Sequence, residues 1–224
     1  FMFKNLFHRR QFLLSMDPIS QIEGWTVLRI DSYFLYAHPD LDVSYATDKS
    51  STIVILGNIY DAGSPQKGNA EIINDIISAA TCLEGLIFKI ERYAGCFALL
   101  FFDNNEAFIL HDARGLREVY YCSGENSIIC GSQPNLIAKF SNPELRETDD
   151  STIVKFYKDD LWDSRWIGDE TYFGGIKHLL PNHYLNIKQR KSVRYWPNKI
   201  ITRLKVDDAV NECCNFLTGI MRAI

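Results

Sequence analysis

Six cysteine thiols are the side chains of this chain with the widest chemical repertoire, since a thiolate can attack a carbonyl, bind a metal ion or form a disulfide. None of them belongs to a C-x-x-C pair, and no histidine–cysteine cluster has the spacing of a zinc site. Cys96 lies in an apolar stretch, whereas Cys213 and Cys214 are adjacent on an expected helix and point to different faces. We therefore expect buried, reduced thiols, with neither a metal nor another cofactor.

Histidines and acidic residues offer further routes to chemistry. His111 ends an expected strand and His183 opens another, and this scattered placement favours structural roles over a catalytic triad. Asp112 and Arg114 are expected to form an ion pair that stabilises a turn. The acidic run 159–164 lacks the regular oxygen-ligand spacing and the final glutamate of a calcium loop, so no metal site is expected there.

Composition and charge exclude several functional classes. The chain is 46% hydrophobic and 23% charged, as is usual for a globular protein. Its net charge of −4, without a basic stripe, gives no electrostatic basis for nucleic-acid binding. The apolar runs are too short to span a membrane, and the patch at 12–14 is too short for a signal peptide. We expect a cytoplasmic protein that binds neither nucleic acid nor membrane.

Apolar stretches with period two predict the strands. Residues 25–30 and 33–37 predict two strands around a turn at Asp31, and the uninterrupted apolar run 52–57 predicts a buried central strand. Two further strands are expected on either side of the polar turn Asn104-Asn105. The remaining expected strands are at 127–131, 183–187 and 192–196, the last two forming a hairpin.

Helical spacing appears between these strands. A helix is expected from Asn69, its candidate N-cap, to Ala80, and a second one over 83–91. Two helices in series between blocks of strands favour an α+β fold over alternating β-α-β units. Further helices are expected from Pro134, over 149–156, and over the amphipathic segment 204–224.

Seven short motifs follow one another in a fixed order between Thr52 and Trp196. They lie at 57–61, 68–73, 93–103, 112–121, 130–133, 171–176 and 180–185. In this order they resemble the N-terminal glutamine-hydrolysing domain of asparagine synthetase-related proteins. That domain is a class II glutamine amidotransferase of the Ntn-hydrolase type.

The resemblance implies an architecture and a place in a larger protein. It implies a four-layer αββα sandwich, in which two antiparallel sheets lie between helices. Residues 1–200 would form the amidotransferase-like domain. Residues 201–224 would form a helix leading toward an ATP-binding synthetase domain that this sequence does not include. The implied partners are such a synthetase domain or a second copy of the chain.

The same resemblance places a substrate pocket and indicates that its chemistry has been lost. Gly57, Asn58, Asn69 and Glu71 match positions of the family's pocket. The family's oxyanion-binding asparagine corresponds to Leu56, although Gly57 keeps a main-chain N–H. Asn69 stands where the family has an acid that binds the substrate ammonium, and its substrate-binding arginine has no match before Gly57. The family's N-terminal nucleophile is also unmatched, since the earliest cysteine is Cys82.

Three functions are open at this point. The favoured one is a catalytically degenerate amidotransferase-like domain that acts as a scaffold or interaction domain of an ATP-dependent amide-forming enzyme. The second is an active Ntn amidohydrolase in which self-cleavage exposes Ser15, Ser20 or Thr26 as the nucleophile. The third is a module that binds an amino acid or amide through Gly57, Asn58 and Asn69.

Overall fold

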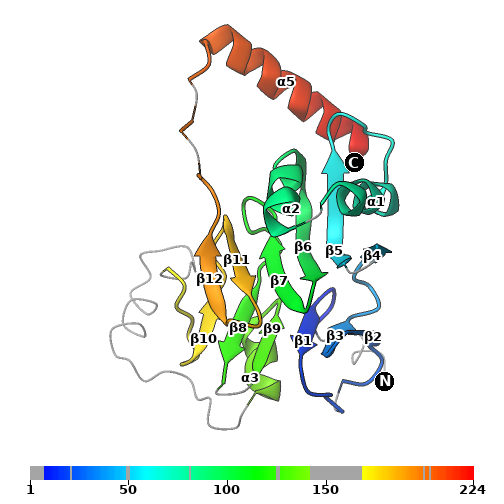
Figure 1. The fold of residues 1–224 in the computed structure, drawn as a ribbon, viewed down its shortest axis with the longest axis vertical. Helices are drawn as coiled ribbons and strands as arrows, with labels where there is room; N and C mark the ends of the chain where they lie inside the picture. The colour runs from blue at the N-terminus through cyan, green and yellow to red at the C-terminus, as the bar shows by residue number, and fades with distance from the viewer. Residues whose placement is uncertain are drawn as a thin grey trace. The chain divides into compact units, whose positions relative to one another are not determined.

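The computed structural model describes residues 8–20, 22–48, 51–80, 82–124, 127–141, 168–198, 200–201 and 203–224. The chain divides into two compact units, and each of them is built from two separate stretches of sequence. Each unit contains one six-stranded sheet in which every pairing is antiparallel (Figure 1). The first unit comprises Phe1–Leu41 and Glu118–Leu180, and the second comprises Asp42–Arg117 and Pro181–Ile224.

The sheet of the first unit has the strand order β10-β8-β9-β1-β3-β2. Helix α3 (Pro134–Phe140) packs on it through Leu136 and Ile137, which join Leu13 and Tyr120 in one buried cluster. The strands are β1 (Phe12–Ser15), β2 (Thr26–Ile30), β3 (Tyr33–Ala37), β8 (Tyr120–Ser123), β9 (Ile128–Gly131) and β10 (Ile176–His178).

The sheet of the second unit has the strand order β12-β11-β7-β6-β5-β4. Its β6–β7 hairpin turns at Asn104 and Asn105, whose φ values of +46° and +65° suit a two-residue turn with the twist of the strands. The strands are β4 (Val43–Asp48), β5 (Ser51–Asp61), β6 (Tyr93–Asp103), β7 (Glu106–His111), β11 (His183–Asn186) and β12 (Lys191–Arg194).

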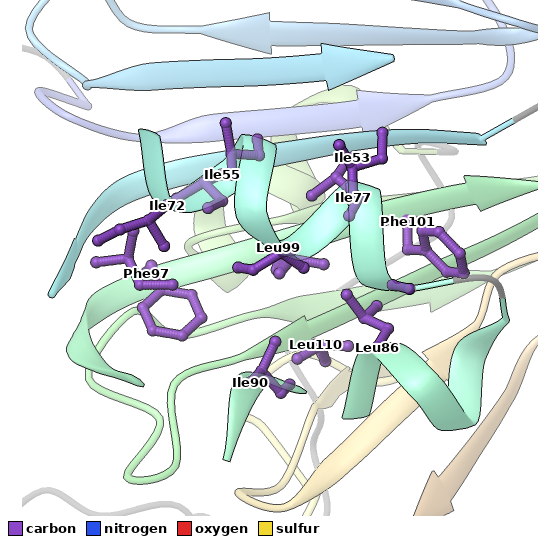
Figure 2. Packing of buried hydrophobic residues seen from close by; sticks show 14 of the residues in the cluster. Ile53, Ile55, Ile72, Ile77, Leu86, Ile90, Phe97, Leu99, Phe101 and Leu110 are labelled. Carbon is purple, nitrogen blue, oxygen red and sulfur yellow. The ribbon is translucent and has the colours of Figure 1, made fainter. Parts of the chain in front are cut away.

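Helices α1 (Asn69–Ala79) and α2 (Leu83–Ile90) cover one face of this second sheet. Figure 2 shows Ile72 and Ile77 of α1 and Leu86 of α2 facing alternate residues of the strands, among them Leu99. Alternation places every second residue of a strand on the same face, so the apolar stripe of each helix meets a matching apolar row. This packing fixes the start of α1 against β5.

Strand β5 is the strand predicted from the apolar run 52–57, and it extends beyond that run at both ends. It pairs with β4 on one side and with β6 on the other. Ile53, Val54, Ile55 and Leu56 are all fully buried, so both faces of the strand are covered. Burial on both faces explains why the sequence here is continuously apolar rather than alternating.

Helix α5 (Val206–Ala223) is amphipathic, as its sequence predicts, and it belongs to the second unit. Its buried residue is Gly219, which lies against the main chain of Ala62 just after β5. A Cβ atom built on Gly219 would be 2.2 Å from the carbonyl oxygen of Ala62. Only a glycine allows this helix to approach so closely.

The α+β class is confirmed, and both sheet–helix pairs from which a four-layer αββα sandwich is built are present. Strands β1, β4, β8 and β10 were not predicted from the sequence. Strand β1 has only four residues, and β4 is largely exposed, so neither carries a strong periodic signal. The helix expected over 149–156 and the acidic run 159–164 lie outside the described residues.

The cysteines depart from expectation in their burial. All six lie among the described residues and are unpaired. Cys130 is buried, and burial raises the pKa of its thiol. Cys82, Cys213 and Cys214 are exposed, so the expectation of buried thiols is wrong for these three.

Two absences hold for the part of the chain that the structure describes. No helix there combines the length and the apolar character that a membrane span needs. Within the same residues, no group of three or more histidine, cysteine, aspartate or glutamate side chains could hold a metal ion.

Candidate functional site

The Gly57 region is the part of the second unit where β5 continues past its neighbour β4. The last ladder pair of these strands is Val43 with Leu56. The main-chain N–H of Gly57 then donates a hydrogen bond of 2.8 Å to the carbonyl oxygen of Asp42. The N–H that the resemblance assigns to an oxyanion is therefore already used within the sheet.

Asn69 occupies the sheet edge that β4 leaves open. Its Nδ2 donates to the carbonyl oxygen of Gly57 at 2.8 Å, and its Oδ1 accepts from the N–H of Ile59 at 3.1 Å. The carbonyl group of Gly57 and the N–H of Ile59 point to the same side of β5. The Asn69 amide therefore supplies the two hydrogen bonds that a further residue of β4 would have made there. Both ends of the Asn69 amide thus serve the fold.

Asn69 is the first residue of α1 and not its N-cap, which is Gly68. The sequence-based assignment of the cap was wrong because the Asn69 side chain bonds to β5 instead of to its own helix. Glu71 completes the helix start: its Oε2 accepts from the N–H of Gly68 at 3.0 Å. A glutamate in this position also lies favourably at the positive end of the helix dipole.

Asn58 and Cys96 are directly opposite each other on β5 and β6. A Cβ atom built on Gly57 would be 2.3 Å from the carbonyl oxygen of Cys96, so a side chain at this position would collide with the main chain of β6. The φ of Gly57 is +109°, a value that side chains rarely allow. The backbone conformation at position 57 therefore requires a glycine. The side chain of Asn58, the next residue, is exposed.

Arg117 is a residue of this region that sequence reasoning did not identify. A Cβ atom built on Gly57 would be 3.2 Å from Nη2 and 3.3 Å from Nε of Arg117, so the guanidinium lies beside the glycine. The resemblance implies an arginine before Gly57, whereas Arg117 lies in the loop after β7. No spacing rule in the sequence links two positions so far apart.

Asp112 holds that loop through the main chain. Its carboxylate accepts hydrogen bonds from the N–H groups of Arg114, Leu116 and Arg117 at 3.2, 3.0 and 2.9 Å. The predicted turn-stabilising role is therefore present, but the contact to Arg114 involves its main chain and not the expected ion pair.

The two histidines considered for a triad contact main-chain oxygens. Nδ1 of His111 lies 3.0 Å from the carbonyl oxygen of Asp112, and Nδ1 of His183 lies 2.9 Å from that of Pro181. Among the candidate hydroxyl nucleophiles, Ser15 is buried in β1 and donates to the carbonyl oxygen of Asp17 at 2.6 Å. Ser20 and Thr26 are exposed.

Comparisons with known proteins find similarity among solved structures. One match is the glutamine phosphoribosylpyrophosphate (PRPP) amidotransferase from B. subtilis complexed with ADP and GMP, with 11% identity, a TM-score of 0.44, and coverage of 87% of this chain and 45% of that chain. Another, described as the allosteric regulatory enzyme of purine biosynthesis, has 11% identity, a TM-score of 0.43, and coverage of 88% and 46%. The chain thus spans about half the length of each. No protein-family model and no curated protein matches it.

Proposed function

We propose that this chain is a glutamine amidotransferase-like domain of the Ntn type, related to that of asparagine synthetases, which has lost glutaminase chemistry. In this proposal it acts in the cytoplasm as a scaffold or interaction domain of a larger ATP-dependent amide-forming enzyme. The ordered motifs support the family assignment. The first three motifs fall on β5, α1 and β6 of the second unit, and the fourth begins in the loop after β7 and ends at β8. The motifs at 130–133 and 171–176 lie in the first unit.

The observation that carries the loss of chemistry is the double hydrogen bond of Asn69 to β5. Stabilising an oxyanion requires donors that are free to point at the substrate, and each such donor contributes about 3 to 4 kcal/mol. At the position of the family's ammonium-binding acid, the Asn69 amide instead bonds to Gly57 and Ile59. The N–H of Gly57 bonds to Asp42, and Leu56 has no donor side chain.

Glutamine hydrolysis by the purified chain tests this proposal directly. We expect no release of glutamate or ammonia above the level of the heat-denatured protein, while an active class II amidotransferase assayed in parallel releases both. Robust release would contradict the loss of chemistry. Mass spectrometry of the N-terminus would then show whether the mature chain begins at an internal serine or threonine, which is the signature of the alternative amidohydrolase.

The partner part of the proposal has a separate test. The reading frame downstream of Ile224 should encode an ATP-binding synthetase domain with a Ser-Gly-Gly-x-Asp loop. If it does, copurification of the chain with that domain would support a scaffold role. A frame without such a domain, together with a monomeric chain in solution, would contradict both proposed partners.

A further inference from the structure

A cavity of about 440 Å³ opens in the second unit beside the C-terminal end of α2. Its walls come from α2, β6, the loop after β7 and the segments that flank the β11–β12 hairpin. The cavity adjoins the Gly57 region through Phe97, which pairs with Gly57, and through Asp112, but it is lined by none of the four residues of the predicted substrate pocket. What it binds therefore does not depend on the function proposed above. Its volume lies within the range of small-molecule sites.

Aromatic rings form much of the wall. Tyr93 and Phe97 project from the same face of β6, and Tyr195 and Trp196 follow β12. Two hydrogen bonds hold this second pair in place: the N–H of Tyr195 donates to the carbonyl oxygen of Asn182 at 2.9 Å, and Nε of Arg194 donates to the carbonyl oxygen of Trp196 at 2.9 Å. Trp196 is 38% exposed, so a ligand can reach its ring.

The charged side chains that line the cavity are all acidic. They are Glu91 and Asp112, the lining includes no lysine or arginine, and the imidazole of His111 is a further titratable group in the wall. Asp112 is buried and held by main-chain N–H groups. Glu91 is the C-cap residue of α2, where the helix dipole adds partial negative charge.

Tyr195 is close enough to both carboxylates to interact with their charges. Burial, together with the nearby carboxylates of Asp112 and Glu91, raises the pKa of Tyr195 to about 12. Burial is the larger cause of this shift, and the negative charge of the two carboxylates, which adds to it, attracts a cation. A cation over an aromatic ring gains further stabilisation from the negative face of the ring.

We propose that this cavity binds an organic monocation, a protonated amine carried on an apolar or aromatic body. The aromatic walls bury the body, and the two carboxylates attract the ammonium. Anions are disfavoured by those carboxylates, and so is the carboxylate end of an amino-acid zwitterion. A bare metal ion is disfavoured because most of the wall is carbon and cannot replace the oxygen ligands of a hydrated ion.

Three ligands that share a phenyl ring on a two-carbon chain, one cationic, one neutral and one anionic, test the ligand class. Phenethylammonium, 2-phenylethanol and phenylacetate are titrated into the full chain by isothermal calorimetry or ligand-observed NMR. We expect the ammonium compound to bind at least about tenfold more tightly than the alcohol, and phenylacetate not to bind. Its advantage should shrink in about 1 M salt, where charges are screened over a few ångströms.

Two variants with matched controls locate the binding. Trp196→Leu should weaken phenethylammonium binding about threefold to fivefold, whereas Tyr45→Leu, which also replaces an exposed aromatic ring, should not. Glu91→Gln should weaken it about twofold, whereas Glu84→Gln, at the other end of α2, should not. Circular dichroism verifies that each variant is folded.

Three results would overturn the proposal. The first is no binding of phenethylammonium up to about 10 mM, the weak end of specific affinities. The second is equal binding of the ammonium compound and the alcohol. The third is ammonium binding that neither Trp196→Leu nor Glu91→Gln weakens. Should Trp196→Leu fail to fold, Glu91→Gln with its control decides the location alone.

Discussion

The side-chain amide of Asn69 donates a hydrogen bond of 2.8 Å to the carbonyl oxygen of Gly57 and accepts one of 3.1 Å from the N–H of Ile59. One residue of α1 thereby satisfies two main-chain groups of β5 at an otherwise open sheet edge. The helix is tied to the strand by hydrogen bonds in addition to its apolar packing. This relationship explains why an amide, and not an acid, suits position 69.

Asn69→Asp, which replaces the amide by a carboxylate, should therefore destabilise the protein. A carboxylate cannot donate to Gly57, and leaving that carbonyl facing another acceptor costs about 1 to 3 kcal/mol. The added charge at the start of α1 returns only about 0.3 to 1 kcal/mol through the helix dipole. We expect a net loss of about 1 kcal/mol or more in the free energy of unfolding, measured with urea.

Asn74→Asp is the matched control, because Asn74 is an exposed asparagine of the same helix. Its effect should stay within about 0.5 kcal/mol, as for most surface substitutions. Equal stability of the two variants would show that the Asn69 amide contributes nothing to the fold.

Gly57→Ala should be strongly destabilising. The φ of +109° disfavours any side chain, and the new Cβ atom would be 2.3 Å from the main-chain oxygen of Cys96. We expect a loss of about 2 kcal/mol or more in urea unfolding, because the contacting atom belongs to a central strand and cannot move away. Gly68→Ala meets no atom within 4 Å and should cost no more than about 1 kcal/mol as a weaker N-cap. Similar losses in both variants would contradict the steric conflict described for a side chain at Gly57.

Gly219→Ala should release α5 from the second unit. Alanine favours the helix itself by about 1 kcal/mol, so α5 should stay helical, but its Cβ atom would meet the carbonyl oxygen of Ala62. We expect faster proteolysis and faster amide exchange in and before α5. Gly85→Ala in α2 is the control, because its nearest contact would be an ordinary 3.7 Å. Unchanged exchange in Gly219→Ala would contradict the docking.

Tyr195 should make stability fall at high pH. Burial, Asp112 and Glu91 raise its folded pKa to about 12, while an unfolded tyrosine ionises near 10. Between these values the unfolded chain has lost the proton and the folded chain has not, so unfolding becomes more favourable as pH rises. We expect the free energy of unfolding to fall between about pH 10 and 12 by about 2 kcal/mol more in the wild type than in Tyr195→Phe. Parallel pH profiles would show that Tyr195 is not buried as described.

Much of the fold was accessible from periodicity. The predicted strand run from Thr52, the paired helices before β6 and the turn at Asn104 and Asn105 all appear where expected. Each depends on neighbours in sequence: an apolar stripe, a cap or a turn residue. Strands β1 and β4 were not predicted, because a short strand, or one with little buried area, has too few buried apolar residues to establish a period.

Only part of the candidate site could be predicted from the sequence. Gly57, Asn58, Asn69 and Glu71 could be proposed from motif order, and whether they form a pocket stays a prediction. Their hydrogen-bond partners could not be proposed, because Asp42, Ile59 and Arg117 reach this region through strand pairing and loop closure. The cavity beside α2 is a stronger case, since its walls come from four separate segments.

The sequence by itself determined the strands and helices with strong apolar periods, and the α+β class, because those properties arise from side chains a few residues apart. The tertiary structure alone decided that Asn69 bonds to β5, that Arg117 lies beside Gly57, and that two carboxylates and four aromatic rings share one cavity. These contacts between residues far apart in the sequence depend on strand register and on the paths of loops. A shift of one residue in register would direct every side chain of a strand to the opposite face.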